Sequence, residues 1–375
     1  MAFIHQTTPR IHFGLGVLQK LGEELMRFPG GPVLIVTDPG VMKAGVAEQA
    51  VKASGRYCVI FSKIEPDPSI ETALACAKAV RETGATVIVG VGGGSAMDTA
   101  KVASIIAHAK QPISEMFGIE LVKDVGLPLI LIPTTAGTGS EVTHIAILSD
   151  EQEHLKKGIV SSRLFPAIAI VDPELTLGVP KSVTAASGMD ALLHAVEAFT
   201  SKNANSVTDT LAKRAMFLIA SNLRAAFENG RNVEARSAML EGAMLAGMAF
   251  ANAGVTAVHA FAYPIGAEFH IPHGVANSIM LGPVLTFNTP GNPTKFAEAG
   301  VAMGLPSDNT AERTIEFMKQ LADDIQIPKH LAEFGVRDEH IPGLARGVMK
   351  VTRLLANNPR ELTHEDAMRL YRQML

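Results

Sequence analysis

Residues 188–199 carry an aspartate and a histidine at a spacing that suits metal binding. In this segment, GMDALLHAVEAF, Asp190 and His194 stand four residues apart, so in a helix both side chains lie on one face. A carboxylate oxygen and an imidazole nitrogen together suit a divalent first-row metal ion. A simple surface pair is the alternative, but the apolar neighbours make solvated side chains the weaker interpretation.

Three further histidines lie close together in AVHAFAYPIGAEFHIPHG, residues 257–274. His259 belongs to a predicted helix, and His273 follows on a turn between Pro and Gly. With the Asp–His pair they would form a site of one carboxylate and three imidazoles, which would accept Fe²⁺, Zn²⁺, Co²⁺ or Ni²⁺. We interpret His270 as a neighbour of this site rather than as a ligand.

A glycine-rich segment, VIVGVGGGSAMDTAK at residues 87–101, indicates a nucleotide site. The pattern predicts a buried strand, a tight turn at Gly93 and Gly94, and a helix. Free N–H groups at the start of such a helix bind a pyrophosphate. The usual GxGxxG fingerprint is absent, because Ser95 stands where its last glycine would be. A tight turn without a ligand remains the alternative.

Two other segments place polar groups directly after predicted strands. Asp38 closes the apolar run 32–38, where a carboxylate could bind ribose hydroxyls and disfavour the 2′-phosphate of NADP. The alternative for Asp38 is a turn-forming residue before proline. The loop at residues 132–143, IPTTAGTGSEVT, suits a polar ligand at the edge of the sheet, unless it is an ordinary polar loop. Its hydroxyls come from Thr134, Thr135, Thr138 and Ser140.

The elements that must position these residues change in type along the chain. In the first half, short apolar runs alternate with helical segments, which predicts a parallel α/β sheet. From about residue 183 onward, long helical segments follow almost without a strand. We therefore predict an α/β domain over residues 1–182 and an all-helical domain over residues 183–375. The predicted strands lie within 32–38, 57–61, 85–95, 127–135 and 167–173.

Composition and charge argue against several classes of protein. The net charge of −4 and the lack of a basic block argue against a nucleic-acid partner. No apolar stretch is long enough to predict a membrane span, and the first residues lack a signal-peptide pattern. The two cysteines form no metal or disulfide framework, which suits a reducing compartment. We therefore expect a cytoplasmic protein without a membrane partner.

Taken together, these motifs resemble those of the iron-containing (group III) alcohol dehydrogenases. The resemblance covers essentially the whole chain, in order, and it implies a dehydroquinate synthase-like fold. In that fold an α/β nucleotide-binding domain precedes an all-helical metal-binding domain. The segments that carry it are GGGSAMDTAK, IPTTAGTGSEVT, DPELT, GMDALLHAVEAF, the stretch from His259 through PHG to Asn277, and NPRELTHEDAMRLY.

The resemblance also implies a role for individual residues. The implied metal ligands are Asp190, His194, His259 and His273, and the ion would be Fe²⁺. The implied contacts of NAD are Asp38, Asp67, Gly93, Gly94, Ser95, Thr134, Thr135, Thr138 and Lys156. The implied substrate pocket comprises Phe250, Tyr263, Ile145 and Leu354. Lys157 is an adjacent alternative to Lys156, and Asp67 occupies a position that is often Asn in the family.

One departure from the family pattern concerns Tyr263, four residues after His259. Many members carry histidine there, with a role in proton relay or substrate contact. We expect Tyr263 to act with the ligands His259 and His273 in catalysis, as a relay member or as a residue that orients the substrate. A phenol with an ordinary pKa of about 10 is a weaker base near neutral pH than imidazole.

The resulting expectation is a metal-dependent, NAD(H)-linked alcohol dehydrogenase or aldehyde reductase. It would transfer hydride between nicotinamide and a small primary alcohol or (semi)aldehyde held at the metal. We also expect a homodimer or a larger homo-oligomer. Three alternatives remain: a hydroxyacid–oxoacid transhydrogenase, a dehydroquinate synthase-like lyase, and a non-enzymatic scaffold of the same fold.

Overall fold

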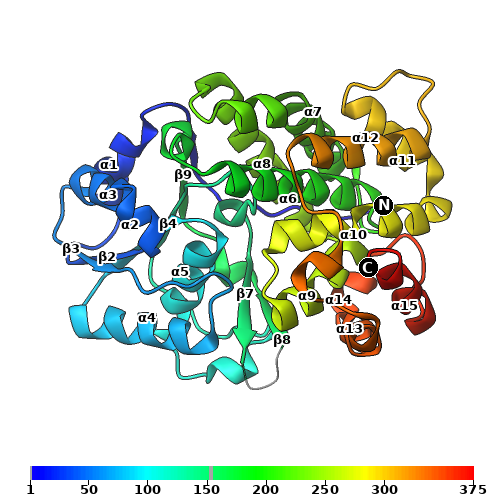
Figure 1. The fold of residues 1–375 in the computed structure, drawn as a ribbon. Coiled ribbons are helices and arrows are strands. Elements are labelled where there is room, and N and C mark those ends of the chain that lie inside the picture. The colour runs from blue at the N-terminus through cyan, green and yellow to red at the C-terminus, as the bar shows by residue number, and fades with distance from the viewer. Residues whose placement is uncertain (1, 152–154) are drawn as a thin grey trace. The chain divides into compact units, whose positions relative to one another are not determined.

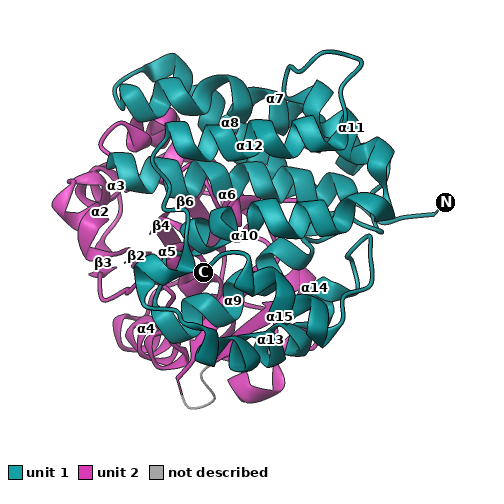
Figure 2. Ribbon diagram, turned by 45° about the vertical axis from the view of Figure 1, so that its right-hand side comes forward, with its two compact units in different colours: residues 1–5, 180–375 teal, residues 6–179 magenta. Residues whose placement is uncertain are grey.

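The computed structural model describes residues 2–151 and 155–375. The chain divides into two compact units, Gln6–Val179 and a second unit formed by Met1–His5 with Pro180–Leu375 (Figure 2). The contacts divide the chain between Val179 and Pro180, whereas the sequence pattern predicts a boundary between residues 182 and 183. Each unit is described by itself below.

The α/β unit is built on a six-stranded sheet in which every neighbouring pair is parallel (Figure 1). The predicted parallel sheet is confirmed, and each predicted apolar run contains a strand. The first strand was not predicted, because its three residues form no apolar run. In sheet order the strands are β1 (Ile11–Phe13), β9 (Ile168–Val171), β6 (Leu129–Pro133), β4 (Val87–Gly92), β2 (Val33–Val36) and β3 (Cys58–Phe61).

Two apolar layers bury this sheet on both faces. Alternate strand residues point to opposite faces, so Val33 and Ile35 join one layer while Leu34 and Val36 join the other. The first layer includes residues of α1 (Leu21–Leu25) and α3 (Val46–Ser54), and the second includes residues of α4 and α5. The helices that matter for the site are α2 (Pro39–Lys43), α4 (Ile70–Thr83) and α5 (Gly94–Ile106).

A small second sheet in the same unit was not predicted. It has the order β5 (Gly118–Ile119), β8 (Leu155–Val160) and β7 (Ile145–Asp150), with β7 and β8 antiparallel. The segment of β8 begins LKKG, and its lysines hide the strand pattern. Over the first four residues of β7 every second residue is buried, which is typical of a sheet with one covered face.

The second unit is helical, and its three longest helices pack against one another. A side chain at Gly242 would lie 2.7 Å from Ile219, so this glycine allows α7 and α8 to approach closely. The helices are α6 (Lys181–Thr200), α7 (Ser206–Glu228), α8 (Val233–Ala253), α9 (Ala257–Phe269), α10 (His273–Asn288), α11 (Pro293–Ala302), α12 (Ala311–Asp324), α13 (Ile341–Lys350), α14 (Thr352–Leu355) and α15 (His364–Arg372). Within the described residues no single helix meets the length and apolarity of a membrane span; α8 and α9 meet them only as a pair bent by 102°.

Candidate metal and nucleotide sites

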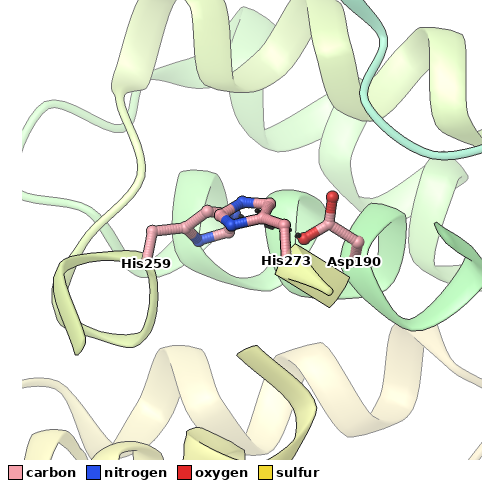
Figure 3. Close-up of side chains that lie close together, drawn as sticks. All are labelled: Asp190, His259 and His273. Carbon is pink, nitrogen blue, oxygen red and sulfur yellow. Dashed lines mark ion pairs between the residues drawn. The ribbon is translucent and has the colours of Figure 1, made fainter. Parts of the chain in front are cut away.

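Three helices of the second unit bring their metal-type ligands together. Asp190 lies on α6, His259 lies in the first turn of α9, and His273 is the first residue of α10. Asp190 Oδ1 lies 3.6 Å from Nε2 of His259 and 3.8 Å from Nε2 of His273. All three ligand atoms lie within 4.8 Å of one another, and Figure 3 shows the side chains directed toward one another. This arrangement suits one metal ion.

His194 lies beside this group rather than within it. Its Nε2 is 4.0 Å from Asp190 Oδ2, the other oxygen of the carboxylate. Its ring stacks between those of His259 and Phe250, with centroid distances of 4.6 and 4.4 Å. His194 is therefore close enough for the fourth position, and its role as a ligand remains a prediction.

The start of α10 reaches α6 because residue 274 is glycine. A side chain at Gly274 would collide with the backbone carbonyl of Ala186 on α6. Pro272 precedes the helix and fixes its start at His273. The PHG motif therefore places the imidazole of His273 at a close crossing of two helices.

Sequence reasoning missed Glu197, which holds His259 in place. Its buried carboxylate accepts hydrogen bonds from the backbone N–H of Val258, at 2.8 Å, from the hydroxyl of Thr256 and from Nδ1 of His259. A proton on Nδ1 leaves Nε2 of His259 as the metal-binding nitrogen. The signal was present, because Glu197 follows Asp190 by seven residues on the same helix face.

Asn277 is a second orienting residue, one helical turn after His273. Its amide Nδ2 donates to Asp190 Oδ1 at 2.7 Å and lies 3.2 Å from Nε2 of His273. Because Asn277 is fully buried, its amide holds one orientation and fixes the carboxylate that it contacts. The sequence motif contained this asparagine without revealing what it contacts.

The electrostatics of the group favour a cation. Burial alone would raise the pKa of Asp190, but the histidines around it outweigh burial and hold that pKa well below its usual range. Burial lowers the pKa of His194 to about 4. Burial would also lower the pKa of His259, but Glu197 and Asp190 raise it to about 9. A metal ion would displace that proton, since imidazole binds metals in its neutral form.

A buried atom without a partner supports the same conclusion. Within the described residues, Nε2 of His259 is buried and has no hydrogen-bond partner, although it faces a carboxylate. A metal ion between the imidazoles and Asp190 would satisfy this nitrogen. The donor set of nitrogen and oxygen atoms fits Fe²⁺ and other divalent first-row ions.

In the α/β unit, the predicted nucleotide residues gather at one edge of the sheet. Asp38 follows β2, Gly93 follows β4 and Thr134 follows β6, and these strands are neighbours in the order β6-β4-β2. The chain leaves β2 toward β3 and leaves β4 in the opposite direction, toward β6. Ligands of open α/β sheets bind at such a reversal, outside the carboxyl ends of the strands.

The glycine turn packs closely against the neighbouring threonine loop. Gly92 has φ of +157°, and a side chain at Gly94 would lie 2.8 Å from Cγ2 of Thr138. Gly93 is the N-cap of α5, and no described side chain caps this helix end. Its first N–H groups are therefore available to an anion such as a pyrophosphate.

Asp38 has the turn-forming role that the sequence offered, and its role at the ribose remains a prediction. Its Oδ1 accepts hydrogen bonds from the N–H groups of Gly40 and Val41, at 2.8 and 3.0 Å, and so caps α2. Its Oδ2 lies 3.2 Å from the position that a Cβ on Gly92 would occupy. The turn-forming carboxylate therefore also faces the glycine turn.

Asp67 and Lys156 form an ion pair, with 2.7 Å between Oδ1 and Nζ. The side chain of Lys156 is only 4% exposed, and Asp67 adopts the left-handed region with φ of +53°. The adjacent Lys157 instead pairs with Asp150 at 2.8 Å. Of the two adjacent lysines, Lys156 is the one that contacts Asp67, another predicted contact of NAD.

The predicted substrate residues occupy different surroundings. Phe250 stacks on His194, and the ring of Tyr263 on α9 lies 6.0 Å from that of His273. Leu354 on α14 is fully buried, and Ile145 belongs to β7 of the α/β unit. His270 is exposed and ends α9 in the left-handed conformation, with φ of +54°. Phe250 and Tyr263 therefore lie beside the ligand histidines.

The α/β unit has a sheet edge suited to a nucleotide, and the helical unit has a buried group suited to a metal ion. Together these features are typical of enzymes that use both a nucleotide and a metal ion. Comparison with known proteins agrees. The family model described as "Iron-containing alcohol dehydrogenase" matches residues 8–173, and "Fe-containing alcohol dehydrogenase family, C-terminal" matches residues 184–375. The chain belongs to the iron-containing alcohol dehydrogenase family and is an oxidoreductase.

Individual relatives match over nearly the whole chain. Sulfoacetaldehyde reductase of Bilophila wadsworthia is 39% identical, over 99% of this chain and 98% of that protein. The crystal structure of a 1,3-propanediol oxidoreductase has a TM-score of 0.96 at 36% identity and covers 100% of both chains. Sulfoacetaldehyde reductase from Bifidobacterium kashiwanohense in complex with NAD⁺ has a TM-score of 0.90 at 31% identity, over 100% of this chain and 99% of that chain. The predicted two-part fold is confirmed.

Proposed function

We propose that this enzyme interconverts small primary alcohols and their aldehydes or semialdehydes, with NAD(H) as hydride carrier and a divalent metal ion as electrophile. The observation that carries the proposal is the buried ligand group of Asp190, His259 and His273. Such a group, in a chain that also carries a nucleotide-type sheet edge, supports metal-dependent hydride transfer.

The predicted cofactors, NAD and Fe²⁺, are borne out by the family description and by the NAD⁺ complex of the relative. When bound, Fe²⁺ supplies a Lewis acid that polarises the substrate oxygen, and NAD supplies the nicotinamide ring that exchanges the hydride. The residues that would hold the ion are Asp190, His194, His259 and His273. Zn²⁺, Co²⁺ and Ni²⁺ fit the same donors.

The surrounding residues keep the ligand atoms in place. Glu197 holds the proton on Nδ1 of His259, which directs Nε2 into the site. Asn277 restrains the carboxylate of Asp190. The ring of Phe250 covers one face of His194 and excludes water from that side. These contacts prepare the site before a substrate arrives, so little reorganisation is needed during the reaction.

On the nucleotide side, backbone groups at the glycine turn would bind the pyrophosphate, and Asp38 would bind the adenosine ribose. A negative charge at Asp38 repels a 2′-phosphate, which favours NAD over NADP. The residues proposed to complete the site are Asp67, Gly93, Gly94, Ser95, Thr134, Thr135, Thr138 and Lys156.

Tyr263 is the residue proposed to contact the substrate hydroxyl, as an orienting or relay group. It lies one helical turn after His259 and beside His273. Phe250 and Leu354 of the helical unit are further proposed substrate residues and are apolar, as is Ile145 of the α/β unit. Apolar side chains around the substrate favour short alcohols over highly charged substrates.

We also propose a cytoplasmic enzyme that acts as a homodimer or larger homo-oligomer. Cys58 and Cys76 are both free thiols, and Cys76 is buried, which suits a reducing compartment. Light scattering coupled to size-exclusion chromatography measures the oligomeric state directly.

A substrate panel on iron-reconstituted protein tests the proposed function. The panel contains ethanol, 1,3-propanediol, 2-hydroxyethanesulfonate and choline with NAD, the corresponding aldehydes with NADH, and a hydroxyacid with an oxoacid without added cofactor. NADH absorbance is followed for the first two sets, and the product acids for the third. We expect turnover with at least one uncharged short alcohol or aldehyde. Product formation only when a hydroxyacid and an oxoacid are both present would contradict it and support a transhydrogenase.

A further inference from the structure

A buried charged pair in the α/β unit has no part in the chemistry described so far. Asp98 and Lys101 stand three residues apart on α5, one and two turns after the glycine turn. The side chain of Lys101 is 0% exposed, and that of Asp98 is 15% exposed. Their charged atoms lie 3.8 Å apart. Burying a charged lysine costs desolvation free energy, which only an ion pair and hydrogen bonds can offset.

The partners of both side chains lie on one segment, residues 140–147. Asp98 Oδ1 accepts a hydrogen bond from the hydroxyl of Ser140 at 2.6 Å, and Oδ2 accepts one from the N–H of Ile147 at 2.9 Å. Lys101 Nζ donates to the hydroxyl of Thr143 at 3.0 Å and to the carbonyl of Ile145 at 2.8 Å. Helix α5 therefore holds this segment at four points.

The same segment continues the polar loop that faces the glycine turn. At its start, the N–H of Thr134 donates to the carbonyl of Gly92 at 3.0 Å. At its end, the N–H of Ser140 donates to the hydroxyl of Thr138 at 3.3 Å. Between these points Thr138 packs against Gly94. The position of Thr138 thus depends on where Ser140 is fixed.

We propose that Asp98 and Lys101 are positioning residues for NAD binding: they clamp residues 140–147 to α5 and so hold the threonine loop over the glycine turn. The inference rests on the proposed use of NAD by this chain. Neither side chain is a predicted metal ligand or a predicted contact of NAD, and the pair acts through Thr134, Thr135 and Thr138. Both halves of the pyrophosphate site, the loop and the start of α5, are thereby fixed by one helix.

A second buried carboxylate in the same unit provides a matched control. Glu24 on α1 has a side chain only 1% exposed and pairs with Arg10, His12 and Arg27, at 3.4, 3.0 and 2.7 Å. None of these residues belongs to the threonine loop or to the glycine turn. Its substitution by glutamine removes one buried carboxylate charge without releasing residues 140–147.

The test measures NADH binding by nicotinamide fluorescence on the iron-reconstituted full chain, together with KM for NAD, kcat and the thermal midpoint. The variants are Asp98→Ala, Ser140→Ala and the control Glu24→Gln. Asp98→Ala should raise Kd for NADH and KM for NAD about tenfold, because it loses the two hydrogen bonds that hold residues 140–147 to α5. Ser140→Ala deletes a single hydroxyl and should raise both about threefold. At saturating NAD, kcat should stay within about twofold of the parent.

Glu24→Gln should lower the thermal midpoint but leave Kd for NADH unchanged. The inference is overturned if Asp98→Ala and Ser140→Ala keep the parental Kd, or if Glu24→Gln weakens NADH binding as much as they do. Ser140→Ala keeps the test decisive should Asp98→Ala not fold. A parent protein that binds no NADH would overturn the proposed function itself, and this inference with it.

Discussion

The metal centre and the nucleotide edge are built by opposite means. At the metal centre, side chains from three helices converge, and buried Glu197 and Asn277 hold them. At the nucleotide edge, the ends of three parallel strands supply backbone groups, and Gly92 and Gly94 pack so closely against Ala96 and Thr138 that neither has room for a side chain. The first region depends on converging side chains, and the second on close packing of the backbone.

The pKa values of buried carboxylates are shifted in opposite directions in the two regions. At the metal centre, neighbouring histidines hold the pKa values of Asp190 and Glu197 below their usual range despite burial. In the nucleotide unit, burial raises the pKa of Asp98, and it raises that of Glu141 to about 7. Asp190 and Glu197 therefore stay charged beside the histidines, whereas burial favours the neutral forms of Asp98 and Glu141.

The largest effect is expected where a ligand is removed. Asp190→Asn deletes the only charged ligand of the group, so metal affinity and kcat/KM should each fall by about 10³-fold or more, equivalent to about 4 kcal/mol. Metal content by mass spectrometry and the rate of NADH formation measure both. NADH affinity should remain at the parental value, and a matching loss there would contradict the separation of the two regions.

The titration of Glu141 should make stability depend on pH. Its pKa in the folded protein is raised from 4.5 to about 7, so the folded state takes up a proton that the unfolded state has released. The resulting stabilisation is complete below about pH 4.5 and is lost as the pH rises through 7, with a size on the order of 3 kcal/mol. Thermal midpoints of the metal-free protein and of Glu141→Gln at about pH 5 and pH 8 check this. Parallel pH profiles for the two proteins would refute the assignment.

Glu197→Gln tests whether orientation matters at the metal centre. The amide N–H of glutamine must face either Nδ1 of His259 or the donors Thr256 and Val258, so one contact is always mismatched. Metal affinity should fall about 10- to 100-fold. Competition with a chromogenic chelator gives the affinity, and the visible spectrum of the Co²⁺ form reports the geometry. The control is Glu24→Gln, which changes a buried carboxylate remote from the ligands in sequence. Equal metal affinity in the parent, Glu197→Gln and Glu24→Gln would exclude an orienting role for Glu197.

A smaller effect than at the metal centre is expected from adding one methyl group at the nucleotide edge. In Gly94→Ala the new Cβ would lie 2.8 Å from Cγ2 of Thr138, so the loop must shift. NADH affinity should fall about fivefold to tenfold while metal affinity is unchanged. Unaltered NADH binding would show that the space at Gly94 is not needed.

The sequence predicted the parts of each region that lie within one element. The spacing of Asp190 and His194 on a helix, and the glycines after an apolar strand, were readable because periodicity fixes which side chains share a face. The spacing also places Glu197 on the face of Asp190, but it does not give the role of Glu197, because its partner His259 belongs to another helix. Asp98 and Lys101 were likewise read as part of a helix, since their partners on residues 140–147 are known only from the fold. Long-range partners of buried polar groups are the information that periodicity lacks.

The central claim is that this chain transfers hydride between NAD and an alcohol only when the metal centre is loaded. Metal-free protein is titrated anaerobically with Fe²⁺ in the presence of NAD and the best alcohol of the panel, and NADH formation is followed. The rate should rise in proportion to added iron and level off at about one ion per chain. A full rate in metal-free protein with chelator present would contradict the account, as would the absence of any NADH at full iron loading.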